Sequence, residues 1–321
     1  MQPPLAQLDA AAAIVYRAMP PTPQYCWPRL SAALGTETWI KHENHTPLGA
    51  FKVRGGLVYM DALVKREPGL RGVLAATRGN HGQSVAFAAA RHGLRTDIYV
   101  PFGNSVEKNA AMRSLGANLV EVGQDFQACR EHAQLVARDE GLHMVPSWHE
   151  DLVAGVATGY LELLRAQPDL DLLLVPIGQG SGICGAIAAR NALGLATRIV
   201  GVVSSHAPAY QLSLRAGHSV SAPVSTVLAD GLACRQPDAA SLVAILAHVD
   251  EIVAVSDDEV AHAMRLYYRA THNLAEGAGA APLAAALQMK DSAAFKGKKV
   301  GLPLTGGNVD AELFRHVLQG P

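Results

Sequence analysis

Short apolar segments alternate with longer helix-like segments along most of the chain. The apolar segments predict buried strands at residues 72–77, 96–100, 118–122, 172–177, 198–203, 251–255 and 299–303. The other segments predict helices at residues 83–92, 106–115, 125–140, 152–164, 185–193, 257–271 and 280–288. Continuously apolar strands separated by helices are typical of a parallel sheet covered on both faces. The pattern therefore predicts an α/β protein.

The composition is that of a folded protein with a near-neutral net charge. Charged residues make up 17% of the 321 residues and hydrophobic residues 49%, the reverse of the balance in disordered chains. At about 150 residues per domain, this length predicts about two domains. Lys and Arg number 27 against 28 Asp and Glu, so no charge excess favours nucleic acid or a membrane as a partner.

The cysteines and the N-terminal segment indicate a reducing compartment. No CxxC pair is present, so neither a zinc site nor a disulfide scaffold is predicted for Cys26, Cys129, Cys184 and Cys234. The apolar run at residues 10–15 is too short for a signal peptide or a membrane span. We therefore expect a cytoplasmic protein.

Three unusual loops follow predicted strands, where parallel α/β sheets bind their ligands. They are residues 77–83 (TRGNHGQ), 178–185 (GQGSGICG) and 304–310 (LTGGNVD). A glycine-rich turn into a helix presents backbone N–H groups to an anion. The second loop contains GxGxxG, but no acid follows the next strand to bind a dinucleotide ribose, and a GK[ST] motif is absent. A single phosphate is therefore the favoured ligand.

A fourth segment, residues 43–56 (ENHTPLGAFKVRGG), contains a lysine with glycines on both sides. Lys52 lies two residues from Arg54 and beside an aromatic ring. A lysine near another cation and among apolar groups has a lowered pKa, which makes its amine a nucleophile. The pattern assigns no helix or strand here. The nearby His42 and His45 lie outside helical spacing, so no metal site is predicted, and residues 149–151 (HED) predict a capped helix start.

Together and in this order, the four segments resemble the fold-type II pyridoxal-phosphate enzymes, specifically the serine/threonine dehydratase family. GAFKVRGG is similar to that family's cofactor-lysine motif, TRGNHGQ to its asparagine loop, GQGSG to its phosphate loop and LTGGNVD to its last cofactor loop. Segments 108–117, 229–232 and 275–281 also fit, and the resemblance covers nearly the whole chain.

The resemblance implies a fold and a domain arrangement. The fold is α/β with two open, mainly parallel twisted sheets covered by helices, the tryptophan synthase β-like fold. A large cofactor-binding domain would comprise residues 1–44 and 149–321, and a small inserted domain residues 45–148. Because the sequence ends soon after residue 310, we expect no C-terminal regulatory domain. A homodimer is the family's common state.

The resemblance also implies a role for each matching residue. Lys52 would be the catalytic residue and would bind the cofactor, pyridoxal 5′-phosphate, with Phe51 packed nearby. Asn80 would hydrogen-bond the ring hydroxyl, and Thr305 would meet the pyridine nitrogen. The phosphate would be held by Gly178, Gln179, Gly180, Ser181 and Gly182. The substrate would be bound by Thr77, Arg78, Gly79, Asn80 and His81.

The sequence departs from the family pattern at several of these positions. Gln179 and Ser181 replace two glycines of the phosphate loop, and Thr305 replaces the usual Ser or Cys. Val203 stands where the family's divalent cation site has an acid, so we expect no metal. Arg78 stands where serine racemases have a serine base. Arginine stays protonated, which disfavours racemisation and opens a role in binding a substrate side chain.

The implied activity is that of a carbon–oxygen lyase. It would convert a β-hydroxy-α-amino acid of the threonine or serine type to a 2-oxo acid and ammonia by eliminating water. A bulkier substrate such as 3-phenylserine or 3-hydroxyaspartate is an alternative, since Arg78 can stack on an aryl ring or pair with a distal carboxylate. Racemisation, β-replacement and a nucleotide-binding or non-enzymatic α/β protein are further alternatives.

Overall fold

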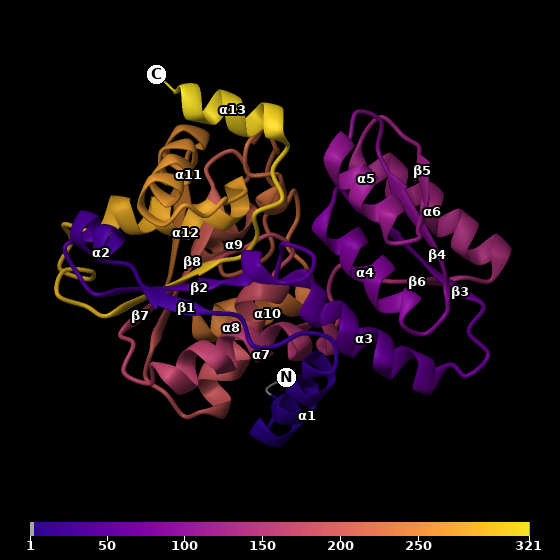
Figure 1. Cartoon of the computed structure of the whole chain (residues 1–321), viewed down its shortest axis with the longest axis horizontal. Helices are drawn as coiled ribbons and strands as arrows, with labels where there is room; N and C mark the ends of the chain where they lie inside the picture. The colour runs from indigo at the N-terminus through magenta and orange to yellow at the C-terminus, as the bar shows by residue number, and fades with distance from the viewer. Residues whose placement is uncertain (1–2, 321) are drawn as a thin grey trace.

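The structure, a computed structural model that describes residues 3–320, contains two separate sheets. One has six strands in the order β1-β2-β10-β7-β8-β9, and the other has four in the order β5-β4-β3-β6. Neighbouring strands are parallel except β1 and β2. Figure 1 shows the four-stranded sheet as a separate lobe, with α4, α5 and α6 around it. The predicted fold of two mainly parallel sheets covered by helices is confirmed.

Residues 72–144 carry the four-stranded sheet and are called the small lobe below; the remaining described residues are the large lobe. The small lobe contains β3 (Gly72–Ala76), β4 (Arg95–Val100), β5 (Asn118–Glu121) and β6 (His143–Met144). The large lobe contains β1 (Gln24–Cys26), β2 (Thr38–His42), β7 (Leu172–Pro176), β8 (Arg198–Ser204), β9 (Glu251–Val255) and β10 (Val300–Leu304). Every predicted strand is present to within one residue at each end. The predicted domain boundaries stay a prediction.

Helices occupy most of the chain between the strands. The large lobe has α1 (Leu5–Tyr16), α2 (Pro28–Leu34), α3 (Lys52–Arg66), α7 (Glu150–Ala166), α8 (Ser181–Ala192), α9 (Ala209–Ala216), α10 (Ala239–His248), α11 (Asp257–Thr271), α12 (Gly277–Met289) and α13 (Ala311–Gln319). The small lobe has α4 (Asn80–Ala90), α5 (Val106–Ser114) and α6 (Phe126–Glu140). Two short 3₁₀ turns of the large lobe are η1 (Glu43–His45) and η2 (Asp230–Leu232).

Three predicted helices begin earlier than their patterns indicated. Helices α4, α8 and α12 start at Asn80, Ser181 and Gly277, three or four residues before the predicted starts. Each first turn contains glycine, a poor helix former, so the sequence pattern alone assigned it to the loop. The predicted cap before α7 is confirmed, because the His149 side chain accepts a hydrogen bond of 3.1 Å from the Asp151 backbone N–H.

Two elements near the site were missed by the hydrophobic pattern. Strand β2 lies between β1 and β10, although its sequence TWIKH ends in two polar residues. Both are buried because they have partners: Lys41 Nζ lies 2.6 Å from Glu162 Oε2, and His42 Nε2 accepts a 2.9 Å hydrogen bond from Trp27. Helix α3 begins at Lys52 itself, in the segment for which no helix was predicted.

Helix α7 positions the starts of both α3 and α8. A Cβ atom on Gly155 of α7 would lie 2.3 Å from the Arg54 carbonyl oxygen, and one on Gly55 would lie 2.9 Å from the Leu152 carbonyl oxygen. A Cβ atom on Gly185 of α8 would likewise lie 3.0 Å from the Ala157 nitrogen. These glycines let three helix backbones approach closely, which brings the first turn of α3 beside the first turn of α8.

No helix in the described range 3–320 combines the length and the apolar character needed to cross a bilayer.

Candidate active site

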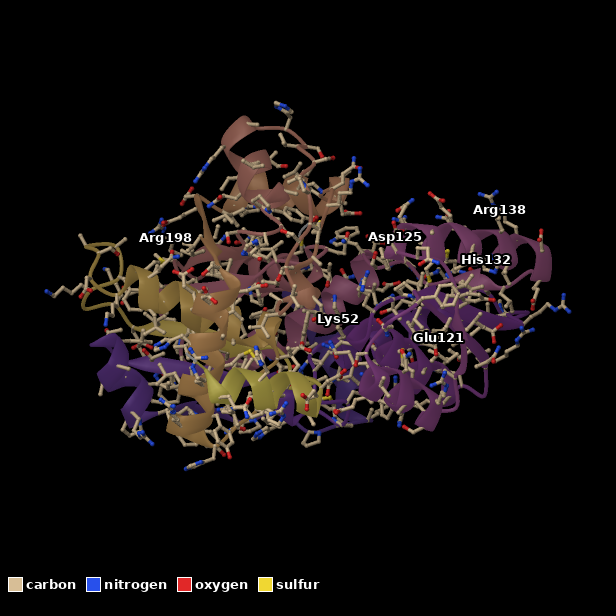
Figure 2. All side chains as sticks on the ribbon, turned by 90° about the horizontal axis from the view of Figure 1, so that it is seen from above. Lys52, Glu121, Asp125, His132, Arg138 and Arg198 are labelled. Atoms are coloured by element: carbon tan, nitrogen blue, oxygen red, sulfur yellow. The ribbon has the colours of Figure 1, made fainter. Side chains whose placement is uncertain are left out.

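The four sequence segments singled out above meet between the two lobes. Lys52 Nζ donates a 2.9 Å hydrogen bond to Ser181 Oγ, which joins the lysine segment to the phosphate loop. The Phe51 N–H donates to the Thr305 carbonyl oxygen at 2.9 Å, and Ala50 pairs with Gly306 in an antiparallel bridge. Asn308 Nδ2 donates to Asn80 Oδ1 at 2.8 Å, which adds the asparagine loop. Figure 2 shows Lys52 in the middle of the molecule, where the two lobes meet.

Lys52 is held where its amine loses a proton easily. It is the first residue of α3, and its backbone carbonyl accepts a 2.6 Å hydrogen bond from Ser84 of α4. Burial lowers the pKa of Lys52 from 10.5 to about 8, and the nearby Glu276 only partly opposes this shift. Lys52 Nζ lies 4.9 Å from the centre of the Phe51 ring, a distance at which the ring attracts the ammonium form. The predicted lowering of the pKa therefore comes from burial and not from the neighbouring Arg54, which is paired with Glu43 and Glu162, and the role of Lys52 as a nucleophile stays a prediction.

The phosphate loop joins β7 to α8 and leaves the start of that helix open to an anion. Gly180 is the N-cap of α8, with a φ of 95° that favours glycine, and no side chain caps the helix. The unsatisfied N–H groups and the dipole of the first turn suit a phosphate. A Cβ atom on Gly178 would lie 2.3 Å from the Gly231 carbonyl oxygen, whereas one on Gly182 would make ordinary contacts with Phe51.

The two non-glycine residues of this loop have different surroundings. Ser181 is buried and its hydroxyl faces the Lys52 amine. The Gln179 carbonyl oxygen accepts a hydrogen bond of 3.2 Å from the Tyr210 hydroxyl, and the Gln179 side chain interacts with the Cys234 thiol. Neither side chain caps α8, so both substitutions leave the backbone N–H groups of its first turn without a side-chain acceptor.

A glutamate that the sequence patterns did not single out lies at the centre of the site. Glu276, the N-cap of α12, is only 4% exposed, and its Oε1 accepts a 2.7 Å hydrogen bond from Asn80 Nδ2. Its Oε2 is buried without a hydrogen-bond partner. Burial raises the pKa of Glu276 to about 7, against the lowering effect of the Lys108 ammonium. The segment 275–281 (AEGAGAA), which fits the family resemblance, contains this residue, but the sequence alone does not reveal that the glutamate is buried.

Thr305 lies at the end of β10, beside the lysine segment. Its side chain is buried, and its backbone carbonyl holds Phe51. The following Gly306 has no room for a side chain, since a Cβ atom there would lie 2.5 Å from Glu276 Oε1. Thr305 is thus kept close to Lys52 and Glu276, in the region where the resemblance implies the pyridine nitrogen.

The predicted substrate-binding residues separate into buried and exposed members. Thr77 is buried, and its Oγ1 accepts a 3.0 Å hydrogen bond from the Gly79 N–H. Burial and the Lys52 charge lower the pKa of His81 to about 3, so the ring is neutral, and its Nε2 is buried without a partner. Arg78 is exposed, and its charge acts on Cys129 of α6. The roles of these residues stay predictions.

The described residues contain no group of three or more His, Cys, Asp or Glu side chains that could hold a metal ion. Val203, at the position where the resemblance places a metal-binding acid, is a buried residue of β8.

The residues present fit a cofactor with an aldehyde and a phosphate. Lys52 supplies an amine of lowered pKa, and the uncapped start of α8 supplies the anion site beside it. Oε2 of Glu276 and Nε2 of His81 are buried polar atoms without a hydrogen-bond partner, and such atoms are ordinarily satisfied in a folded protein. The fold and the site together are those expected of an enzyme that binds a phosphorylated aldehyde cofactor through a lysine.

Comparison with known proteins identifies the family. The model of the pyridoxal-phosphate-dependent enzyme family matches residues 15–306, so the chain belongs to this family and uses pyridoxal phosphate. It is 37% identical over 290 residues to an L-threonine ammonia-lyase of Geobacter sulfurreducens, covering 90% of this chain and 71% of that protein.

Two further relatives have other names. An L-threo-3-hydroxyaspartate ammonia-lyase of a Pseudomonas species is 32% identical over 302 residues, covering 93% of each chain. The structure of maize serine racemase superposes with a TM-score of 0.92 at 26% identity, covering 99% of this chain and 98% of that chain. The fold is therefore that of the fold-type II pyridoxal-phosphate enzymes.

Proposed function

We propose that this chain is a pyridoxal-phosphate-dependent ammonia-lyase. It removes water from a β-hydroxy-α-amino acid of the threonine or serine type and releases a 2-oxo acid and ammonia. The observation that carries this proposal is the Lys52 amine, with its lowered pKa, beside the uncapped start of α8. The similarity to the L-threonine ammonia-lyase of Geobacter sulfurreducens supports the choice of reaction.

In this proposal the cofactor supplies an electron sink for negative charge at the substrate α-carbon. The first turn of α8 binds the phosphate through its backbone N–H groups, and Asn80 and Thr305 orient the ring. Lys52 Nζ takes and holds the α-proton, since a pKa near 8 leaves a useful fraction of the amine neutral near neutral pH. The Ser181 hydroxyl, 2.9 Å away, orients that amine.

The pyridine partner supports elimination over transamination. Thr305 has a hydroxyl in place of a carboxylate, and a hydroxyl does not hold a proton on the pyridine nitrogen as a carboxylate does. With Thr305 as the pyridine partner, a bound cofactor would be a weaker electron sink, which would favour departure of the β-hydroxyl. We propose that Thr77 and His81 bind the α-carboxylate of the substrate.

Replacement of Lys52 by Ala tests the proposal. Lys52→Ala should remove the visible absorbance of the lysine-bound cofactor and lower threonine turnover at least about a thousand-fold, because the base is gone. The control is Lys65→Ala on the same helix, since the Lys65 side chain is 71% exposed. A Lys52→Ala protein that keeps both absorbance and turnover would overturn the assignment.

A second candidate substrate is 3-hydroxyaspartate, favoured by the exposed Arg78 and by the similarity to the Pseudomonas enzyme. The test compares L-threonine, L-serine, 3-phenylserine and L-threo-3-hydroxyaspartate as substrates of the wild type and of Arg78→Ala. If Arg78 binds a distal carboxylate, Arg78→Ala lowers kcat/KM for hydroxyaspartate alone, by about tenfold or more. Formation of the D-amino acid faster than the 2-oxo acid would favour a racemase instead.

We also propose that the protein is a homodimer in the cytoplasm. The family resemblance supports the dimer, and four unpaired cysteines support a reducing compartment. Light scattering on the purified protein tests the first statement, and cell fractionation tests the second. A monomeric mass or recovery of the protein outside the cytoplasm would contradict them.

A further inference from the structure

Lys108 is a buried cation that connects the two lobes and that no sequence motif assigned to the site. It lies on α5 of the small lobe, and its side chain is 9% exposed. Its stem packs on the asparagine loop, because a Cβ atom on Gly79 would lie 2.5 Å from Lys108 Cδ. Its Nζ lies 2.7 Å from Asp230 Oδ2 and 3.8 Å from Glu276 Oε2, both in the large lobe.

Glu276 depends on this cation. Its Oε1 is engaged by Asn80, whereas its Oε2 is buried without a hydrogen bond. A buried carboxylate is costly unless a charge of opposite sign lies close to it. Among residues 3–320, Lys108 is the one ion-pair partner of Glu276. Loss of the Lys108 charge would therefore favour the protonated form of Glu276.

The charges that face Glu276 come from three elements. Lys108 of α5 and Lys52 of α3 lower its pKa, whereas Asp230 of η2 raises it. Asn80 of α4 also lowers it through the hydrogen bond. Because Asp230 and Lys108 act with opposite signs, removing one or the other should shift the titration of Glu276 in opposite directions.

We propose that Lys108 is a positioning residue that favours the ionised form of Glu276 and orients its carboxylate, and through Glu276 holds the Asn80 amide at the cofactor. Asn80 Nδ2 donates to Glu276 Oε1, and Asn80 Oδ1 accepts from Asn308, so the amide is fixed at both ends. A protonated Glu276 would be a weaker acceptor for Asn80. The proposal rests on the proposed cofactor site and does not depend on threonine being the substrate.

The neighbouring residues of α5 provide a matched control. Glu107 Oε1 accepts a 2.7 Å hydrogen bond from the Ala311 N–H, and Ser105 donates to Asp310. Both contacts cross between the lobes, as the Lys108 contacts do, but neither involves Glu276. Glu107→Gln therefore perturbs the same interface and leaves the Glu276 charges in place.

The experiment is a pH titration of the visible absorbance of the bound cofactor in holoenzyme variants. The absorbance reports charge near the cofactor ring and does not require turnover. Lys108→Met should move the transition assigned to Glu276 upward by about one pH unit or more, Asp230→Asn should move it downward, and Lys108→Arg should restore the wild-type value within about half a unit. Cofactor affinity, measured by fluorescence, should fall in Lys108→Met alone.

Three results would overturn the proposal. They are a folded Lys108→Met holoenzyme with an unchanged transition, a Glu107→Gln protein with the same upward shift, and an upward shift in Asp230→Asn. If Lys108→Met fails to fold, the proposal is tested by the direction of the shift in Asp230→Asn and by the pH of the transition in Lys108→Arg. An enzyme that titrates as expected but does not act on threonine would keep this inference and contradict the proposed substrate.

Discussion

The lowered pKa of Lys52 predicts an unusual pH dependence for the uptake of the cofactor. Only a neutral amine attacks an aldehyde, so the rate at which the cofactor-free protein binds pyridoxal phosphate should follow the neutral fraction of Lys52. Burial lowers the pKa of Lys52 to about 8, although Glu276 acts in the opposite direction. Uptake should rise about tenfold per pH unit below that pKa and level off above it.

The size of the effect follows from the two pKa values. At about pH 7.5, an amine with a pKa of about 8 is roughly 24% neutral, whereas an ordinary lysine at 10.5 is roughly 0.1% neutral. The protein should therefore present roughly 240 times more reactive amine than an exposed lysine at that pH. Because Glu276 raises the pKa of Lys52, Glu276→Gln should move the midpoint of uptake to lower pH.

Stopped-flow absorbance provides the measurement. The cofactor-free protein is mixed with pyridoxal phosphate across a range of pH, and growth of the visible band gives the rate. An N-acetyl-lysine amide serves as the control, and the rate of its reaction with pyridoxal phosphate should rise with pH until its own, ordinary lysine pKa. A protein whose rate also rises without a plateau until near the ordinary lysine pKa would refute the reasoning, as would an upward midpoint shift in Glu276→Gln.

Two further predictions concern packing. Gly178→Ala should lower cofactor affinity by about a hundredfold, because its Cβ atom would lie 2.3 Å from the Gly231 carbonyl oxygen and the loop must move by about 1 Å. Gly182→Ala, whose Cβ atom would make contacts of 3.6 Å or more, should leave the unfolding temperature unchanged or raise it. Equal unfolding temperatures and equal cofactor affinities in the two variants would contradict this prediction. Arg54→Met should lower the free energy of unfolding by about 3–5 kcal/mol, because the buried Glu43 carboxylate loses the guanidinium that lies 2.7 Å away. Denaturant titration measures this free energy, and a decrease below about 1 kcal/mol would contradict the prediction.

The parts of the fold that were predicted correctly are those in which local sequence and environment agree. Strand β7 (Leu172–Pro176) is apolar throughout and is buried throughout, so its pattern was sufficient. Strand β2 was missed because Lys41 is buried against Glu162, a residue 121 positions later in the chain. No local pattern contains that partner. Helix α3 was missed because its first turns contain two glycines, poor helix formers, and their close packing partners, α7 for Gly55 and Ser84 of α4 for Gly56, lie elsewhere in the chain.

The candidate site shows the same division. Lys52, Asn80 and Ser181 begin helices α3, α4 and α8, Thr305 directly follows β10, and their motifs were visible along the chain. Glu276 was not singled out, because its importance comes from its burial and from the Asn80 amide 196 positions away. Arg78 is exposed, and its role in binding a substrate side chain stays a prediction.

Local sequence was enough to predict the alternation of strands and helices, the loops proposed to bind the cofactor and the lysine proposed to react, because each prediction uses residues close together in the chain. The tertiary structure decided the electrostatics. Burial between the lobes lowers the pKa of Lys52 and raises that of Glu276, and Lys108 reaches Glu276 only because α5 packs against the large lobe. Desolvation and charge pairing depend on distances through space, which a linear pattern does not contain.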